Sequence, residues 1–194
     1  MNPILVDVMR GAAVESTHRG AVAVLDADGA VCMSLGDIDR PIFPRSAVKV
    51  LQALPLVASG AADQLALSDE ELAIACASHN GEERHVRTAA AMLAKAGLDA
   101  GALECGAHWP YLDAATHALA RDGRMPGALH NNCSGKHAGF LCLACALHGA
   151  GKAELQRFCS GYVEPEHPVM REVTAALQAA TGFDLARTAH GIDG

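Results

Sequence analysis

Aromatic residues are scarce in this chain, and basic residues are outnumbered by acidic ones. Aromatic side chains make up 4% of the 194 residues, which leaves few platforms for stacking bases or sugars. The formal net charge is -7 at pH 7, whereas a surface that binds nucleic acid or an anionic membrane needs a basic patch. We therefore expect neither nucleic acid nor membrane among the partners of this protein.

Long apolar runs, export signals and nucleotide-binding motifs are also missing. The sequence has no apolar run of about 18 residues, and its first residues lack the basic stretch and apolar core of a secretory signal. The seven cysteines are an odd number without the spacing of a disulfide framework, so we expect free thiols and a cytoplasmic location. Without a Gly-x-Gly-x-x-Gly motif or a phosphate loop, we expect no nucleotide cofactor.

The rest of the composition is typical of a globular protein. Hydrophobic residues make up 51% and charged residues 19%, so we expect one domain over residues 1–194. Apolar runs at residues 4–9, 21–25 and 30–35 predict strands. The Asp-Ala-Asp-Gly sequence at 26–29 predicts a hairpin turn between the last two. The N-terminal part is therefore predicted to be an antiparallel meander.

From Ser46 onward the apolar residues recur at helical spacing. The first helix should be kinked or ended early by Pro55, which lacks a backbone N–H. Ser68 followed by Glu71 predicts the capped start of a second helix, which ends near residue 77. Further helices are predicted at residues 83–96, 111–122, 135–148, 152–162 and 168–181. Strands followed by helices indicate an α/β protein of the α+β or mixed kind.

Arg45, Ser46 and Lys49 form the first cluster that could carry chemistry. Ser46 and Lys49 are three residues apart, close to one helical turn, so their side chains share a face. A neutral lysine amine can take the proton of a serine hydroxyl, and burial and the nearby Arg45 charge would favour the neutral amine. Backbone N–H groups at a helix start could stabilise an oxyanion. The alternative is a helix cap beside a solvated lysine.

A polar loop at residues 76–82 follows an apolar helical stretch and forms the second cluster. Ser78 in this loop offers a second hydroxyl, and Asn80 offers an amide that could donate to a substrate or accept from it. Serine, asparagine and glycine are also common turn formers, so the alternative is an ordinary turn between two helices.

The third cluster spans residues 130–137 and precedes a predicted apolar helix. Cys133 and Lys136 are one helical turn apart, and both the helix start and the nearby amine favour the thiolate. Cys133 could then be a nucleophile or a metal ligand, and the alternative is a polar cap beside a buried thiol. Cys142 and Cys145, in contrast, lie inside an apolar helical pattern and are interpreted as core packing.

Taken together, four segments resemble the rhizobial-type L-asparaginases, also called the class 3 or asparaginase II group. The segments occur in the family's order at residues 43–49, 77–81, 131–139 and 190–194. The resemblance implies a serine-β-lactamase-like fold, in which an antiparallel sheet packs against helices. It also implies a homodimer that hydrolyses its small-molecule substrate, L-asparagine, to L-aspartate and ammonia.

The resemblance further implies roles for individual residues. Ser46 would be the nucleophile, Lys49 its base, and Ser78 the serine of a second Ser–Lys pair. Arg45 and Asn80 are assigned to substrate binding. Two hypotheses of other classes stay open. One is a different Ser–Lys acyl-transfer hydrolase that acts on β-lactams or peptides, and the other is a non-catalytic module that binds a metal or an amino acid.

A zinc site near the substrate is implied as well. Cys133 and Lys136 would be two of its ligands, and Asp193 would contact the amino or carboxyl end of the substrate. In family members a cysteine that follows the last matching segment is the third ligand, and a further segment carries the lysine partner of Ser78. The resemblance therefore implies that residues 1–194 are the N-terminal part of the domain.

Overall fold

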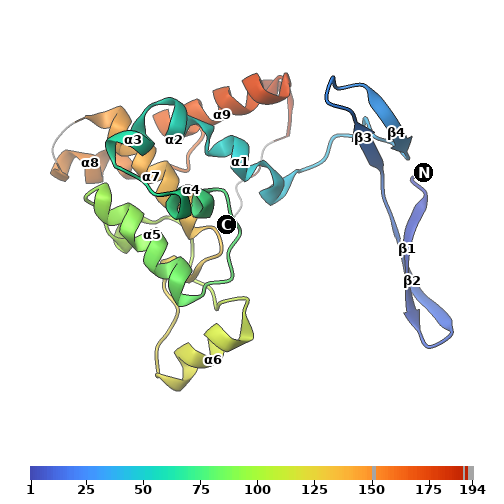
Figure 1. Cartoon of the computed structure of the whole chain (residues 1–194), viewed down its shortest axis with the longest axis horizontal. Helices are drawn as coiled ribbons and strands as arrows, with labels where there is room; N and C mark the ends of the chain where they lie inside the picture. Colours follow the sequence, from blue (N-terminus) through green and yellow to red (C-terminus); the bar gives the residue numbers. More distant parts are fainter. Residues whose placement is uncertain (150–151, 190, 192–194) are drawn as a thin grey trace. The chain divides into compact units, whose positions relative to one another are not determined.

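The computed structural model describes residues 1–149, 152–189 and 191, and it divides into two compact units, Met1–Pro44 and Arg45–Gly194 (Figure 1). All described strands lie in the first unit, and all described helices lie in the second. The presence of antiparallel strands together with helices agrees with the predicted α+β class. The serine-β-lactamase-like arrangement and the single domain stay predictions.

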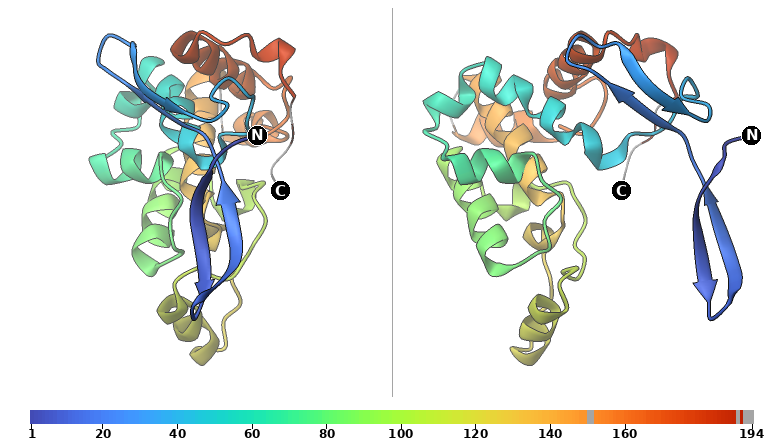
Figure 2. Two further views of the ribbon diagram at one scale, coloured as in Figure 1. Left: turned by 90° about the vertical axis from the view of Figure 1, so that its right-hand side faces the viewer. Right: turned by 45° about the vertical axis from the view of Figure 1, so that its right-hand side comes forward.

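Two β-hairpins make up the first unit (Figure 2). β1 (Ile4–Arg10) pairs antiparallel with β2 (Ala13–Arg19), and β3 (Val22–Leu25) pairs antiparallel with β4 (Val31–Leu35). Gly11 occupies the tight turn after β1 with a φ of 61°, in the left-handed region that glycine adopts without strain. The three predicted strands are confirmed, but β2 was not predicted. The described strands form two separate sheets rather than one meander.

The second hairpin turns where the sequence predicts. The Asp26 carboxylate accepts the backbone N–H groups of Asp28 and Ala30 at 3.0 and 2.8 Å, and this kind of local bond fixes a tight turn. The strand β2 was not predicted because polar Glu, Ser, Thr, His and Arg side chains make up most of it. Its strand conformation depends on pairing with β1 more than on its own composition.

One apolar helix, α7 (Ser134–His148), packs against both α4 (Asp69–Ala75) and α5 (Glu83–Lys95) in the second unit (Figure 1). Most of its residues as far as Ala144 are buried, as expected for a helix that is apolar on all sides. Gly135 allows α4 to approach, because a Cβ at this position would clash with the backbone carbonyl of Ile74. The two helices are therefore in backbone-to-backbone contact near the start of α7.

The other helices largely follow the prediction. Ser68 Oγ accepts the backbone N–H of Glu71, and the Glu71 carboxylate accepts that of Ser68, which confirms the capping box. The predicted first helix is divided into three short pieces, and Pro55 lies in the first turn of the third. The elements not yet given are η1 (Arg45–Val48), α1 (Lys49–Gln52), α2 (Leu54–Ala58), α3 (Ala61–Gln64), η2 (Ala100–Ala102), α6 (Asp113–Arg121), η3 (Ala128–His130), α8 (Lys152–Cys159), α9 (Pro168–Thr181) and η4 (Leu185–Arg187).

Apolar side chains from several helices form the core of the second unit. Its members include Leu56, Ile74, Met92, Leu93, Leu141, Leu143, Leu155, Val169 and Val173. Cys142 is fully buried among them, and burial raises the pKa of its thiol to about 12, so the thiol stays protonated. The prediction of core packing is confirmed for Cys142. Cys145 is half-buried, and both cysteines are free thiols.

Candidate active site

Lys49, the first residue of α1, is only 3% exposed. Its Nζ lies 2.7 Å from Ser78 Oγ, 3.0 Å from the Ala77 carbonyl oxygen and 3.2 Å from Cys133 Sγ. The carbonyl can only accept, so Lys49 donates to it, whereas the hydroxyl and the thiol can each donate or accept. A neutral amine would therefore keep a lone pair for the proton of one of these two groups. We name Lys49, Ser78 and Cys133 the Lys49 cluster.

Ser78 reaches the cluster from the loop between α4 and α5. This loop is tied to the segment before α7, because the backbone N–H of His79 donates to the Asn132 carbonyl oxygen at 3.1 Å. Gly81 has a φ of 73°, and a Cβ there would lie 2.9 Å from Pro110 Cβ. Only glycine suits both that conformation and that space. The loop therefore follows one tight path past the site.

Cys133 reaches the cluster as the N-cap residue of α7. Its backbone N–H donates to Asn131 Oδ1 at 2.8 Å, and Asn131 Nδ2 donates to the Gly106 carbonyl oxygen at 2.6 Å. Asn131 is buried, and both ends of its amide are hydrogen-bonded, as a buried amide requires. This asparagine fixes the start of α7 and, with it, the position of the thiol.

The buried His79 bridges the loop after α4 and the start of α7. The backbone N–H of Gly81 donates to Nδ1 at 3.1 Å, so Nε2 carries the ring proton and donates to Ser134 Oγ at 2.9 Å. Burial is the main cause that lowers the pKa of His79 to about 4, and the nearby charges of His85 and Lys49 add to it. The ring is thus neutral at neutral pH, as its hydrogen bonds require.

His137, also on α7, belongs to a second buried pair. Its Nδ1 lies 2.7 Å from the hydroxyl of Tyr162, which accepts the backbone N–H of Glu104 at 3.0 Å. Burial, assisted by the charges of Lys136 and Lys49, lowers the pKa of His137 to about 3. Burial also raises the pKa of Tyr162. Both side chains are therefore neutral near neutral pH.

The structure brings together three of the predicted site residues, Lys49, Ser78 and Cys133. Ser46 is exposed on η1 and is not among the three groups that contact the Lys49 amine. Arg45, exposed directly before it, has a φ of 51°, in the left-handed region where a residue other than glycine is strained. Such strain clusters at functional sites. The roles of Ser46 as nucleophile and Lys49 as its base stay predictions.

The other predicted residues are more scattered. Asn80 is exposed in the loop after α4. Lys136 is half-buried on α7, and its Nζ lies 5.7 Å from the centre of the Phe140 ring, within cation–π range. Asp193 lies outside the described residues. The substrate-binding roles of Arg45 and Asn80 stay predictions.

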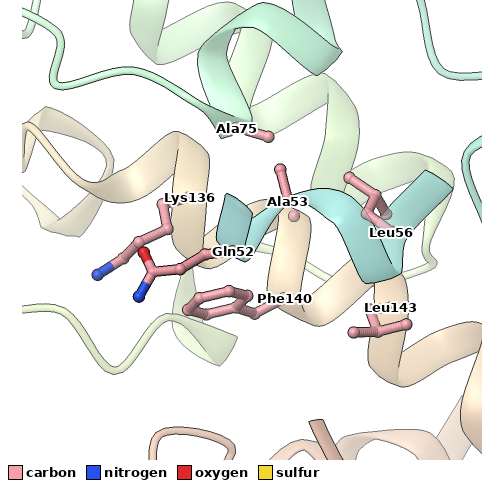
Figure 3. A pocket seen from close by; sticks show the side chains of 8 residues that line it. Gln52, Ala53, Leu56, Ala75, Lys136, Phe140 and Leu143 are labelled. Carbon is pink, nitrogen blue, oxygen red and sulfur yellow. The ribbon is translucent and has the colours of Figure 1, made fainter. Parts of the chain in front are cut away.

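A small pocket beside Lys136 lies between α1, α2, α4 and α7 (Figure 3). It is lined by Gln52, Ala53, Leu56, Ala75, Lys136, Gly139, Phe140 and Leu143. Figure 3 shows the amine of Lys136 and the amide of Gln52 on one side, with apolar side chains around the rest. The cavity is only about 10 Å³, room for about one water molecule, so it does not by itself hold an amino acid.

Cys133 is a predicted zinc ligand and belongs to the Lys49 cluster. Thiolate sulfur is a ligand that zinc favours, and zinc takes three or four ligands from a protein. Over residues 1–149, 152–189 and 191, no three His, Cys, Asp or Glu side chains are placed to hold a metal ion. The described donors alone therefore do not complete a zinc site, and zinc binding by Cys133 and Lys136 stays a proposal.

Two residues that shape the site, His79 and Asn131, were missed in the sequence. Neither residue belongs to a pattern of its own, because each acts through contacts with distant parts of the chain. Their position in the sequence is the signal that could have identified them. Each lies within two residues of Ser78 or Cys133 and inside a segment that resembles the asparaginase family.

Comparison with known protein families gives a match that spans almost the whole chain. The family model described as L-asparaginase II covers residues 6–194. No curated protein matches the chain. Within the part of the chain that the structure describes, no helix has both the length and the apolar character needed to cross a membrane.

Proposed function

The chain belongs to the L-asparaginase II family, and from this premise we propose that it hydrolyses L-asparagine to L-aspartate and ammonia. Family membership supports a hydrolase of the asparaginase type. The observation that carries the mechanism is the contact between the buried Lys49 amine and the Ser78 hydroxyl at 2.7 Å. An amine in hydrogen-bond reach of a hydroxyl can act as a base, so this contact supports Lys49 as the base. The choice of Ser46 as the nucleophile rests on the family resemblance.

We assign the nucleophile to Ser46 and the base to Lys49. The Ser46 oxygen would attack the side-chain amide carbon of asparagine while its proton passes to the neutral Lys49 amine. That proton then moves to the amide nitrogen, the C–N bond breaks, and ammonia leaves an aspartyl ester on Ser46. Ser78 would hold the Lys49 amine in place through its hydrogen bond, which keeps the base in one geometry during the reaction.

The second half of the reaction would return the enzyme to its starting state. A water molecule attacks the ester carbonyl and gives a proton to Lys49. The ester bond then breaks, and the Ser46 oxygen recovers the proton. One water is consumed, and one ammonia and one aspartate are released. Arg45 and Asn80 would bind the substrate, and Lys136 would hold either the metal or an anionic end of the substrate.

Zinc binding and a homodimer belong to the same proposal and rest on the family resemblance. A zinc ion held by Cys133 and Lys136 would orient and polarise the substrate when bound. The support that the described residues give is the thiol of Cys133, a soft ligand of the type that zinc favours. The steps assigned to Ser46 and Lys49 do not depend on the metal.

Ammonia release from L-asparagine by the purified protein tests the proposed function. L-Glutamine and a chromogenic β-lactam serve as alternative substrates. We expect ammonia from L-asparagine and, after an acid quench, an aspartyl adduct that mass spectrometry locates on Ser46. Hydrolysis of the β-lactam without release of ammonia would point to a different Ser–Lys hydrolase. Binding of L-asparagine without turnover would point to a non-catalytic module.

A further inference from the structure

Two residues that flank the Lys49 cluster contact each other. Ser78 and Cys133 both contact the Lys49 amine. The residues that follow them in the sequence, His79 and Ser134, meet through a hydrogen bond of 2.9 Å between Nε2 and Oγ. His79 and Ser134 are 55 positions apart, so this bond joins two segments that have no local reason to be neighbours.

The hydrogen bonds around this pair run in one direction. Because the backbone N–H of Gly81 donates to His79 Nδ1, His79 Nε2 carries the proton and donates to Ser134 Oγ. The Ser134 hydroxyl in turn donates to the Leu129 carbonyl oxygen at 2.9 Å. His79 is 5% exposed and Ser134 is 0% exposed. Loss of either residue therefore leaves a buried polar group without one of its hydrogen-bond partners, and water does not reach this group to replace it.

Backbone contacts hold both members of the pair in place. The backbone N–H of His79 donates to the Asn132 carbonyl oxygen at 3.1 Å, which ties the loop to the segment before α7. Next to Ser134, Gly135 lies against the backbone of Ile74 near the end of α4. A shift of the pair would therefore have to displace α4 or α7.

We propose that His79 and Ser134 are a positioning pair that holds Ser78 and Cys133 at the Lys49 amine. The pair takes no part in the proposed bond changes and acts through its two sequence neighbours. One buried hydrogen bond thereby sets the distance of both neighbours from the base. The kinetic consequence of this inference rests on the proposed function, whereas the geometry of the cluster can be measured without catalysis.

The first test follows the reactivity of the Cys133 thiol toward iodoacetamide in Ser134→Ala, with a metal chelator present. Tryptic cleavage releases residues 125–136, in which Cys133 is the single cysteine, so its modification can be counted by mass spectrometry. We expect the rate to fall by roughly threefold or more, because the Lys49 amine, 3.2 Å from the thiol, is the group that can take its proton during alkylation, and a displaced thiol loses it. An unchanged or higher rate in the folded variant would overturn the proposal.

Two further variants separate positioning from general loss of stability. Tyr162→Phe is the matched control, because it also removes one hydroxyl from a buried hydrogen bond to a histidine on α7. We expect its Cys133 reactivity to equal that of the wild type, even where its melting temperature falls as far as that of Ser134→Ala. His79→Gln keeps an N–H that can reach Ser134, so it should retain more reactivity than His79→Leu. Equal losses in these two variants would count against the pair.

Kinetics distinguish this inference from the proposed function. In Ser134→Ala we expect kcat for L-asparagine to fall by roughly 10- to 100-fold with little change in KM, because displaced catalytic groups slow the chemical step. If the wild type lacked asparaginase activity but Ser134→Ala still lost Cys133 reactivity, the proposed function would fail and the pair would stand. Full activity in Ser134→Ala would refute the pair and leave the proposed function standing.

Discussion

The Lys49 amine and the Ser78 hydroxyl oxygen lie 2.7 Å apart, although the two residues are 29 positions apart in the sequence. The amine also contacts Cys133, which is 84 positions away. The three groups that contact this buried amine come from two parts of the fold, because Ala77 and Ser78 are neighbours in the loop after α4 and Cys133 lies at the start of α7. The chemistry of the site therefore depends on this one side chain.

Replacement of Lys49 by Met should abolish turnover of L-asparagine at every pH tested. Methionine fills a similar volume but provides no base and no hydrogen bond to Ser78. The test is to measure kcat of the purified variant as a function of pH. Lys95→Met is the control, since Lys95 donates to Glu71 at 2.6 Å in the same unit and should cost stability without changing activity per folded molecule. Retention of more than about a tenth of wild-type kcat by Lys49→Met would contradict the prediction.

Ser46→Ala and Ser78→Ala should fail in different ways. Loss of a nucleophile costs several orders of magnitude in kcat, so Ser46→Ala should form no aspartyl-enzyme. Ser78→Ala should still form the adduct, more slowly, because it loses a partner of Lys49 and not the attacking oxygen. Rapid-quench mass spectrometry of both variants decides the matter. An adduct found on Ser78 in the Ser46→Ala protein would reverse the two assignments.

Lys136→Ala should raise KM for L-asparagine and leave kcat within about threefold of the wild type. Lys136 lies beside the pocket with Gln52 and Phe140, and in the proposed function it holds either the metal or an anionic end of the substrate, so its loss should weaken apparent binding. Initial rates over a wide range of substrate concentration give both constants. The Lys49→Met protein is the comparison. Identical kinetic losses in the two variants, with KM unchanged in both, would show that the lysines do not have separate roles.

Cys133→Ser should remove the metal while most of the fold remains. Together with a third ligand outside the described residues, the Cys133 thiolate should bind about one zinc per subunit, and residues 1–194 alone should bind it poorly. Serine oxygen is a poor substitute for thiolate sulfur. The core of the second unit does not depend on the metal, unlike that of a zinc finger. Metal analysis and circular dichroism of wild type and variant make the comparison, with Cys145→Ser, outside the Lys49 cluster, as control. Equal zinc content in wild type and Cys133→Ser would exclude Cys133 as a ligand.

His79 should make the protein less stable as pH falls. Its pKa in the folded protein is about 4, below its ordinary value of 6.5. Between these values the unfolded chain binds a proton that the folded protein does not, so the free energy of unfolding falls by up to about 1.4 kcal/mol per pH unit. Urea unfolding from pH 4.5 to 7.5 measures the slope. His79→Gln should show a shallower slope than the wild type, whereas His117→Gln, at an exposed position on α6, should not. Equal slopes in the wild type and His79→Gln would contradict the assignment.

Local features of the fold could be predicted from the sequence because they depend on neighbouring residues. Ser68 and Glu71 form the predicted capping box, and α9 (Pro168–Thr181) has the predicted ends. The strand β2 (Ala13–Arg19) could not be predicted, because its polar sequence becomes a strand through pairing with β1.

The candidate site shows the same division between local and distant information. Spacing placed Ser46 and Lys49 together, but the fold directs the Lys49 amine to Ser78 and Cys133. The residue types of the cluster could be read from the sequence, whereas their pairing could not. The burial that keeps the His79 ring neutral likewise results from packing between distant segments, so the local sequence pattern does not indicate it.

The contact between Gly135 and the backbone of Ile74 has a consequence for how the core can change over time. Because α4 and α7 touch through their main chains, the separation between them is set by peptide geometry and not by the size of any side chain. Ser78 follows the end of one helix, and Cys133 lies at the start of the other. Substitutions among the apolar side chains can therefore accumulate and alter stability while the spacing of the two residues is kept. Position 135 is different, because only glycine preserves the spacing there.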